Sequence, residues 1–491
     1  MYFINGHEIV LNRQEKLEAW ADPDHIVNLA MNFIKNCPLD ENNRLPWYLQ
    51  YSCFWTDPLR PTIWPDNPAG KFAWAVTTLL KYYPYSGDEH FIDITQTMLD
   101  TLLAHAVPSG YEWAGALYAS AEPGTAIYQG ARADGEFATE PDKVAQVGRA
   151  LADFYELTGE EKYLLAAKSC ADVLVKHLRA GDESHSPVPF RVDVRDGCII
   201  EEYTSDMIPL VRLFDELDRL GVGKYEAFSR QVMDWIKRFP MKTNLWKGYF
   251  EDIRLDIENN NRDQLSPLET ARYLLEEQPS DCDWTHEVPR LIEWVKETLG
   301  APEFFYAEPI HEQKFCYFVM GSHTARYASL CALWSQYSSD LSYRERAIRA
   351  LNWASYMASD DGTVTVGVDR PDYYNQCWFT DGYFDYVPHF IDCMAAIPRL
   401  APSDADHLLA SSSVVKQIDY RPNRIHYKTF DQVGKQTFKL SFVPLQVCCG
   451  KELLARCDSV EDHPGWFYDT EESVVQIHHQ EADIEILGTE S

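Results

Sequence analysis

The feature of this sequence that most restricts its fold is a helical hairpin that recurs along the first four hundred residues. Residues 75–102 and 147–174 align so that Tyr83 falls on Tyr155. In each segment a Ser/Thr-Gly pair follows that tyrosine by three residues and separates two amphipathic halves. Glycine at this place commonly ends a helix in the left-handed conformation. Each segment therefore predicts two antiparallel helices joined by a short turn.

Three further copies of this plan occupy residues 207–236, 327–358 and, more loosely, 266–300. Five hairpins account for ten helices, and one unpaired helix remains near each end, at about 22–36 and 380–397. If these two helices pair, six hairpins close into a ring. An open solenoid is the alternative, and it would leave both end helices without partners. We therefore predict a mainly α fold, an (α/α)6 barrel, which is a toroid of six helical hairpins.

After Pro402 the pattern changes to short segments that alternate apolar and polar residues and are rich in β-branched types, such as SSSVVKQIDY and KQTFKLSFVPLQVCC. Alternation with period two is typical of β-strands. We expect a toroidal catalytic domain over residues 1–402 and a small C-terminal antiparallel β-sheet domain over residues 403–491.

Charge limits the partners that this chain can bind. The 491 residues include 44 Lys and Arg against 76 Asp and Glu, a formal charge of -32, which repels nucleic acid and anionic membranes. No stretch is apolar for long enough to span a bilayer. The N-terminus lacks the pattern of a secretion signal, and the twelve cysteines are scattered. We expect reduced thiols and favour the cytoplasm; an export signal removed from the sequence would instead indicate the periplasm.

The segments that precede the first helix of each hairpin are long and polar, whereas the turns inside the hairpins are short. In a closed ring all these long segments lie at one mouth. Their rings suit sugar faces, and their carboxylates suit general acid and base chemistry. The rings are Trp55, Trp64, Trp378, Tyr203, Tyr373 and Tyr374, and the acids are Asp134, Glu136, Glu202, Glu312, Asp381 and Asp385.

The expected ligand at this mouth is an anionic sugar. Helix N-termini attract anions, and Arg132, His323 and Arg326 add donors for a carboxylate. We therefore expect a carbohydrate substrate that contains a uronic acid. Further candidate contacts are Trp378 and Tyr374 as a platform, with Tyr203, Tyr383 and Asp385 beside them.

Several of these acidic positions also have a structural explanation. Asp142 and Asp206 stand where helices begin, which predicts N-caps. Glu269 follows Ser266 by three residues, as in a capping box. Asp381 fits the first turn of a helix, where it complements the dipole. His323 has the alternative of a buried histidine with satisfied hydrogen bonds.

Other chemistries lack their motifs. The sequence has no GxSxG elbow, no glycine-rich phosphate loop and no HExxH. The adjacent pairs 448–449 (Cys-Cys) and 478–479 (His-His) would point to opposite faces of a strand and make poor chelates. We expect neither a metal nor a cofactor, and assembly into a homo-oligomer stays open.

The Tyr-x-x-[ST]-Gly turns at 83–87 and 155–159, the segments GSHTARYAS and WFTDGYFDY, and the β tail resemble those of the six-hairpin, or (α/α)6-toroid, glycosidases and related polysaccharide lyases. The resemblance covers about residues 20–490 at the level of fold. Within that group the chain is most similar to bacterial sequences of glycoside hydrolase family 154, a β-glucuronidase family. The tryptophan and Arg-Gly-Asn motif of unsaturated glucuronyl hydrolases is absent, which argues against hydration of unsaturated sugars.

The leading hypothesis is an exo-acting hydrolase that releases a glucuronic-acid-like residue from a glycan. One of Glu312 and Asp381 would protonate the leaving group, and the other would activate water or attack the anomeric carbon. Glu136 and Glu202 are further catalytic candidates.

Three alternatives stay open beside the hydrolase. A polysaccharide lyase would use Tyr383, Tyr327 and His323. A sugar epimerase of the N-acylglucosamine 2-epimerase type would use two histidines such as His323 and His389, although the β tail counts against it. A non-catalytic glycan-binding protein would need only the aromatic platforms.

Overall fold

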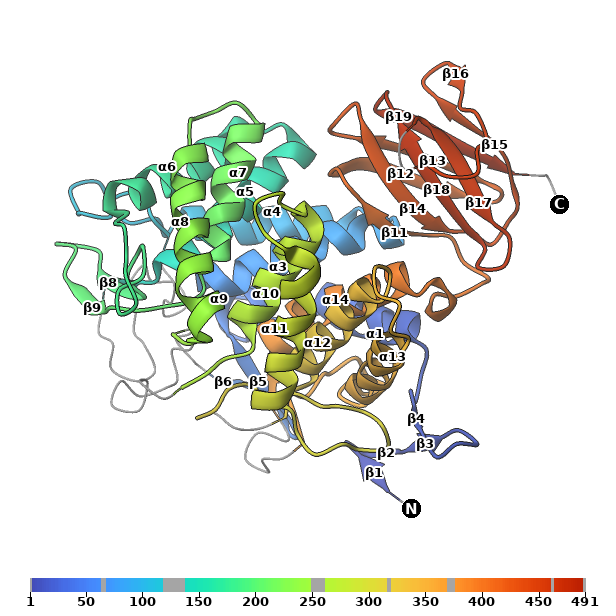
Figure 1. The fold of residues 1–491 in the computed structure, drawn as a ribbon, viewed down its shortest axis with the longest axis horizontal. Helices are drawn as coiled ribbons and strands as arrows, with labels where there is room; N and C mark the ends of the chain where they lie inside the picture. Colours follow the sequence, from blue (N-terminus) through green and yellow to red (C-terminus); the bar gives the residue numbers. More distant parts are fainter. Residues whose placement is uncertain are drawn as a thin grey trace.

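The structure is a computed structural model that describes residues 2–62, 68–117, 137–248, 261–315, 319–368, 376–460 and 463–488. A large helical body carries a separate β domain at one end, and the N-terminus lies at the other (Figure 1). Across the described ranges, no helix combines the length and the apolar character that crossing a membrane requires.

The helical body consists of two concentric rings. Each inner helix packs against the next, and α14 returns to α3. The inner helices are α3 (Pro68–Ser86), α5 (Pro141–Thr158), α7 (Ile208–Arg219), α10 (Leu265–Glu277), α12 (Gly321–Trp334) and α14 (Val387–Ala396). Their outer partners are α4 (His90–Leu103), α6 (Glu161–His177), α8 (Glu226–Arg238), α11 (Trp284–Leu299), α13 (Ser342–Ser355) and α1 (Pro23–Lys35). Two further α-helices of the described residues are single turns, α2 (Trp47–Gln50) and α9 (Pro240–Thr243).

The ring closes through the two helices that the repeat left unpaired. Helix α1 packs along α14. The apolar stripe of α1 is buried, and it recurs at helical spacing through Ile26, Val27, Ala30, Met31 and Ile34. The predicted (α/α)6 barrel is thus confirmed, and the open solenoid is excluded.

The glycines of the hairpin turns act as predicted. Gly159 has φ 76° and its amide donates to the carbonyl of Tyr155, which ends α5. Gly87 has φ 75° and its amide donates to Tyr83 over 2.7 Å. In both turns the left-handed residue turns the chain back into the outer helix.

Small sheets flank the ends of the inner helices. In one, β5 (Cys53–Thr56) lies between β6 (Leu59–Thr62) and β10 (Gln376–Trp378). A second joins β7 (Ala138–Thr139), β8 (Arg191–Asp193) and β9 (Ile199–Glu201). Near the N-terminus, β1 (Phe3–Ile4) pairs with β2 (His7–Glu8), and β3 (Val10–Leu11) pairs with β4 (Leu17–Glu18).

The C-terminal strands form two antiparallel sheets around an apolar core. The chain leaves the helical body through a short 3-10 helix, Pro398–Leu400, before its first strand. One sheet has the order β11 (His407–Ser411), β14 (Gly434–Lys439), β18 (Val474–His479) and β17 (Gly465–Asp469). The other has the order β12 (Val415–Arg421), β13 (Arg424–Thr429), β19 (Asp483–Gly488), β15 (Pro444–Cys449) and β16 (Glu452–Leu453).

The β domain rests on the C-terminal end of α3. The hydroxyl of Tyr420 donates to the carbonyl of Pro84 over 2.6 Å and accepts from the amide of Leu408 over 2.9 Å. The imidazole of His407 stacks on Tyr85 with ring centroids 4.1 Å apart. Because this domain covers the end where inner helices finish, the end where they begin stays clear of it.

The chain enters α14 differently from the prediction. Residues Phe379–Phe384 form a π-helical turn, in which the amide of Asp385 donates to the carbonyl of Thr380 over 2.8 Å. The α-helix begins only at Val387. Asp381 therefore lies in the first turn of a helix, as predicted, but the helix is the π-helical turn and not α14.

Candidate active site

The inner helices begin at one end of the toroid, and side chains from their first turns meet there. Gln264, at the start of α10, contacts His323 and Arg326 in the first turns of α12. Lys143, in the first turn of α5, lies 3.9 Å from the carboxylate of Asp206, which precedes α7. These contacts bring together the starts of helices that are far apart in sequence, as the predicted mouth requires.

Arg326, in the second turn of α12, is a positively charged residue in contact with several of these side chains. Its side chain is fully buried and ion-paired with the carboxylate of Asp385. Its Nη1 donates to Oε1 of Gln264 over 3.0 Å and lies 3.1 Å from Nδ1 of His323. The guanidinium also lies 5.2 Å from the ring centroid of Trp74. Burial among these partners fixes the guanidinium in one orientation.

His323 is neutral in this environment. Burial, together with the positive charge of Arg326, lowers its pKa to about 3. Its Nδ1 accepts from Nε2 of Gln264 over 2.8 Å. Since Nδ1 is the acceptor, the network assigns the ring proton to Nε2. His323 is therefore a neutral imidazole that carries its proton on Nε2.

A chain of titratable side chains leads from Asp385 through His389 and Arg272 to Asp392. The carboxylate of Asp385 lies 3.1 Å from Nε2 of His389, whose Nδ1 lies 3.3 Å from Nη2 of Arg272. Arg272 also donates to Asp392 over 2.9 Å. Burial raises the pKa of Asp385 and lowers that of His389. Burial also acts to raise the pKa of Asp392, but nearby Lys81 and Arg272 bring it down to about 2.

A cavity of about 250 Å³ lies beside this network. Five of the six inner helices line it, so it occupies the centre of the ring, and we call it the bore cavity. Its lining includes Trp74, Gln146, Asp206, Glu269, Arg272 and His389.

Two carboxyl groups of the bore cavity differ in their electrostatic surroundings. Burial and the charges of Asp142, Asp263 and Glu269 raise the pKa of Asp206 to about 8, against the opposing effect of Lys143. By contrast, Oε1 of Glu269 faces two guanidinium groups, at 3.4 Å from Nε of Arg326 and 3.7 Å from Nε of Arg272. A carboxyl group with a raised pKa thus shares a cavity with a carboxyl group that faces two guanidinium groups.

The capping roles predicted for the acidic residues are wrong. No side-chain cap precedes α7, so Asp206 is not an N-cap. Asp142 is not a cap either, because α5 begins one residue earlier, at Pro141. Asp263, not Ser266, holds the start of α10, since its Oδ1 accepts from the amide of Ser266 over 2.8 Å. Glu269 therefore does not form a capping box and faces the bore cavity instead.

Among the predicted site residues, the structure brings His323, Arg326 and Asp385 into one network. Glu312 is buried in the segment that leads to α12, where its neighbour Gln313 accepts from Asn261 over 2.6 Å. Asp381 is half-buried in the π-helical turn. Trp378 packs against Met320 and Val366 and donates to Gln376 over 3.2 Å.

Other predicted residues are engaged in packing or in peripheral ion pairs. Tyr383 is fully buried, stacks on Phe33 and donates to the carbonyl of Gly362 over 3.1 Å. Tyr203 is buried and donates to the carbonyl of Leu245 over 3.0 Å. Glu202 is ion-paired with Arg179 at the end of α6. Arg132, Asp134, Glu136, Trp64, Tyr373 and Tyr374 lie outside the described residues.

Asp206 and Glu269 are the residues that the sequence interpretation undervalued. The positions of the prolines could have located the helix starts correctly, because proline is favoured in the first turn of a helix. Pro209 places Asp206 just outside α7, and Pro267 places Ser266 inside α10. Within the parts of the chain that the structure describes, no group of three or more His, Cys, Asp or Glu side chains is arranged to hold a metal ion.

No protein-family model and no curated protein matches this chain. Solved structures match it in fold. A D-mannose isomerase is 12% identical with a TM-score of 0.56, and the match covers 77% of this chain and 97% of that one. A cellobiose 2-epimerase from Spirochaeta thermophila is 10% identical with a TM-score of 0.55, covering 77% and 97%. A family 76 glycoside hydrolase from a bovine Bacteroides thetaiotaomicron strain is 12% identical with a TM-score of 0.52, covering 77% and 78%.

At these identities the likeness establishes the fold alone. The chain is a six-hairpin (α/α)6 toroid, the class that the sequence resemblance indicated. Its placement in glycoside hydrolase family 154 stays a prediction.

Proposed function

We propose that this protein is a carbohydrate-active enzyme, and specifically a glycoside hydrolase that releases a uronic acid from a glycan. The observation that carries the proposal is the pair Asp206 and Glu269 in the bore cavity. Glycoside hydrolysis needs one carboxyl group that donates a proton and a second that acts as base or nucleophile. The raised pKa of Asp206 suits the first role, and the two guanidinium groups that face Glu269 suit the second.

In the proposed reaction, the carboxyl of Asp206 donates its proton to the glycosidic oxygen as the bond to the anomeric carbon breaks. Glu269 is the partner carboxylate, which either activates a water or attacks the anomeric carbon directly. Trp74 offers an apolar face for the sugar ring. Glu312 and Asp381, in segments that lead to α12 and α14, are a second candidate pair.

A uronic acid suits the charge of this end of the toroid. The positive ends of the inner-helix dipoles meet there, together with Lys143 and Arg326. The structure changes the proposed role of Arg326, however, since Asp385 and Glu269 already face it. We infer that Arg326 orients Glu269, and that the substrate carboxylate interacts with the helix N-termini.

The test is turnover of aryl glycosides by single variants. We expect Asp206→Asn and Glu269→Gln to lower kcat/KM for an aryl β-glucuronide by about 10²-fold to 10⁴-fold. The same assay with Glu312→Gln and Asp381→Asn decides between the two pairs. Glu202→Gln is the matched control, because that carboxylate is ion-paired away from the bore cavity. Full turnover by Asp206→Asn and Glu269→Gln would contradict the assignment.

The lyase alternative is weakened by the positions of its tyrosines. Tyr327 is fully buried with its hydroxyl 2.7 Å from Glu308, and Tyr383 is buried in the core. Burial raises the pKa of both hydroxyls well above their usual range, which is opposite to what a base requires.

Aldose epimerisation is the second candidate function. The observation that favours it is the link between His323 and His389 through Arg326 and Asp385. Such an enzyme would exchange the hydrogen at C2 of an aldose with solvent, so deuterium incorporation from heavy water distinguishes it from a hydrolase. Cleavage of the aryl glycoside without exchange supports the hydrolase.

A further inference from the structure

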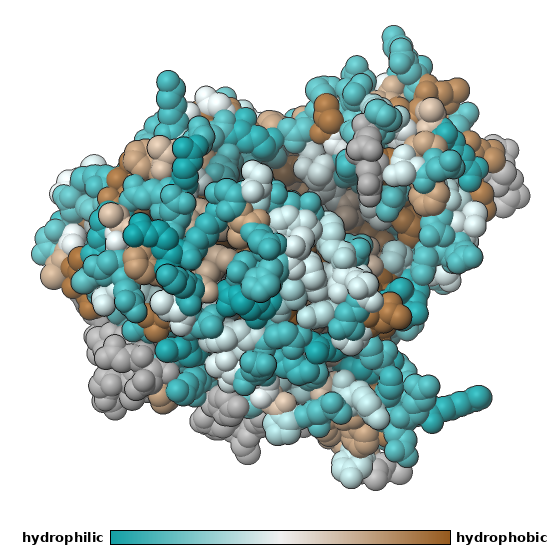
Figure 2. All heavy atoms as spheres, in the orientation of Figure 1, coloured by the Kyte–Doolittle hydropathy of each residue, from teal (hydrophilic) through white to brown (hydrophobic). Residues whose placement is uncertain are grey.

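A second and larger hollow lies at the opposite end of the toroid, between the helical body and the β domain. Its volume is about 800 Å³, and we call it the interdomain cleft. The C-terminal halves of α3, α5 and α7 form one wall, and residues 408–415 and 431–433 form the other. Figure 2 shows the surface hollowed between these two bodies. The volume lies within the range of small-molecule sites, about 300–1,000 Å³.

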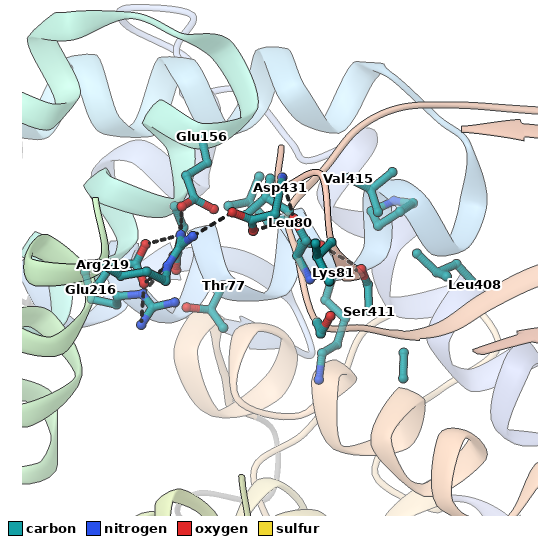
Figure 3. A pocket seen from close by; sticks show the side chains of 18 of the residues that line it. Thr77, Leu80, Lys81, Glu156, Glu216, Arg219, Leu408, Ser411, Val415 and Asp431 are labelled. Carbon is teal, nitrogen blue, oxygen red and sulfur yellow. Dashed lines mark hydrogen bonds and ion pairs between the residues drawn. The ribbon is translucent and has the colours of Figure 1, made fainter. Parts of the chain in front are cut away.

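The polar wall of the cleft is held rigid by ion pairs. Arg219 lies between Glu156, Glu216 and Asp431, as Figure 3 shows, and its Nη1 is 2.9 Å from the carboxylate of Asp431. Arg149 pairs with Asp153 at 2.8 Å and with Glu216 at 3.4 Å. Of these pairs, the one between Arg219 and Asp431 joins the helical body to the β domain.

The rest of the lining, which comes from both walls, is apolar or hydroxyl-bearing. Leu80, Pro84, Leu408, Leu409, Val414 and Val433 provide aliphatic surface, and Ser411, Ser412 and Ser413 provide hydroxyls. The carboxylates and guanidinium groups of the cleft present hydrogen-bond acceptors and donors side by side, an arrangement that matches the adjacent hydroxyl groups of a sugar. The aliphatic surface matches the C–H faces of a sugar ring.

Charge at this end disfavours anions. Four carboxylates surround the two arginines of the cleft, and Lys81 is ion-paired with Asp392. Burial raises the pKa of Glu216 to about 7, and Asp153 and Asp431 add to the shift while Arg149 opposes it. The inner helices also end here, with the negative ends of their dipoles. A neutral ligand is therefore favoured over the uronic acid proposed for the bore cavity.

We propose that the interdomain cleft is a binding site for a neutral saccharide of about two sugar units. The site adjoins the bore cavity, since the two hollows share Thr77, Lys81, Arg149 and Asp153 in their linings, but only the cleft is lined by residues of the β domain. It does not depend on the proposed hydrolase activity. It gives the β domain a role in ligand recognition, since that domain builds one wall.

Two exposed valines of the β domain provide a matched test. Val433 lines the cleft and is 57% exposed, whereas Val443 is 56% exposed and is not among the cleft residues. Val433→Trp would fill the cleft, and Val443→Trp would add the same side chain elsewhere. Because both positions are on the surface, both variants are expected to fold, and unchanged thermal unfolding would verify this.

The probes are three neutral disaccharides, cellobiose, maltose and lactose, titrated by ligand-observed NMR against the full chain. We expect at least one to bind with a Kd on the order of 1 mM. Val433→Trp should weaken that binding by about tenfold or more, whereas Val443→Trp and Asp206→Asn should leave it within about twofold. Glucuronate, the anionic control, should bind no more weakly to Val433→Trp than to the wild type.

Each remaining result overturns the proposal. If none of the three probes binds, or if Val433→Trp binds them as the wild type does, the cleft is not a neutral saccharide site. If Asp206→Asn abolishes binding and Val433→Trp does not, the sugars occupy the bore cavity. That outcome would contradict the cleft proposal while leaving the proposed hydrolase intact.

Discussion

Oδ1 of Asp385 lies 3.1 Å from Nε2 of His389, four residues later, while the other oxygen of the same carboxylate holds Arg326. One buried carboxylate thus connects Arg326 on α12 to His389 on α14, and through His389 to Arg272. Its replacement by a neutral group would leave the fully buried guanidinium of Arg326 with only the longer contact to Glu269, 3.4 Å from its Nε. Buried ion pairs contribute little in net free energy when formed, but breaking one is costly.

Asp385→Asn should therefore lower the free energy of unfolding by about 3–5 kcal/mol, measured by chemical denaturation. The control is Asp419→Asn, which removes an ion pair with Arg421 whose side chains are 40% and 62% exposed. That exposed pair should contribute less than about 1 kcal/mol. Equal losses in the two variants would show that Asp385 has no special structural role.

His323 predicts a loss of stability in acid. Its pKa is about 3 in the native state and 6.5 ordinarily, so between these values the unfolded chain binds a proton that the native state does not. The free energy of unfolding should fall as pH drops from 6.5 toward 3, by up to about 1.4 kcal/mol per pH unit from this residue. His389 acts in the same direction. The slope should be shallower in His323→Gln, and an identical slope would refute the neutral histidine.

Asp206 predicts the opposite trend with rising pH. Its pKa is about 8 in the native state and 3.8 ordinarily, so the native state holds an extra proton between these values. This residue should cost stability increasingly as pH rises from 4 to 8. Asp206→Asn removes the titration, so the variant should gain stability relative to the wild type over that range. Paired denaturation curves at pH 5 and pH 8 measure the difference, and a constant offset would rule out the raised pKa.

Gly87 and Gly159 occupy equivalent hairpin turns and should respond differently to alanine. Both have left-handed φ, so each substitution should cost about 1 kcal/mol from backbone strain. A Cβ at Gly159 would meet open space, whereas at Gly87 it would lie 2.9 Å from the ring of Tyr420 in the β domain. Thermal unfolding should therefore show a larger loss for Gly87→Ala. Equal losses would mean that the contact between the domains yields easily at this point.

The ring could be predicted from the sequence because its signals are local and repeated. The turn glycines mark the hairpins, and the stripe on 22–36 requires a partner that only the helix near 380–397 can supply. The π-helical turn before α14 could not be predicted in this way. It depends on packing against α3, which the spacing of Asp381 and Asp385 does not reveal.

The site was predicted less completely, for a physical reason. An acidic residue near the start of a helix can either cap that helix or point into the bore cavity. The local sequence does not distinguish these two positions of the side chain. Asp206 and Glu269 point into the bore cavity. Tyrosines in irregular segments lack the periodicity that separates buried from exposed positions, so the burial of Tyr203 and Tyr383 gave no signal. His323, Arg326 and Asp385 were found because they lie on segments already expected to meet.

The pairing of α1 with α14 joins segments separated by more than 350 residues of chain. A ribosome that has synthesised α1 must therefore add nearly the whole toroid before that helix finds its partner. During this time the stripe from Ile26 to Ile34 stays without its native cover, and contacts of such long sequence separation form slowly. The nascent chain should depend on chaperones until α14 has emerged, and versions truncated before Val387 should aggregate.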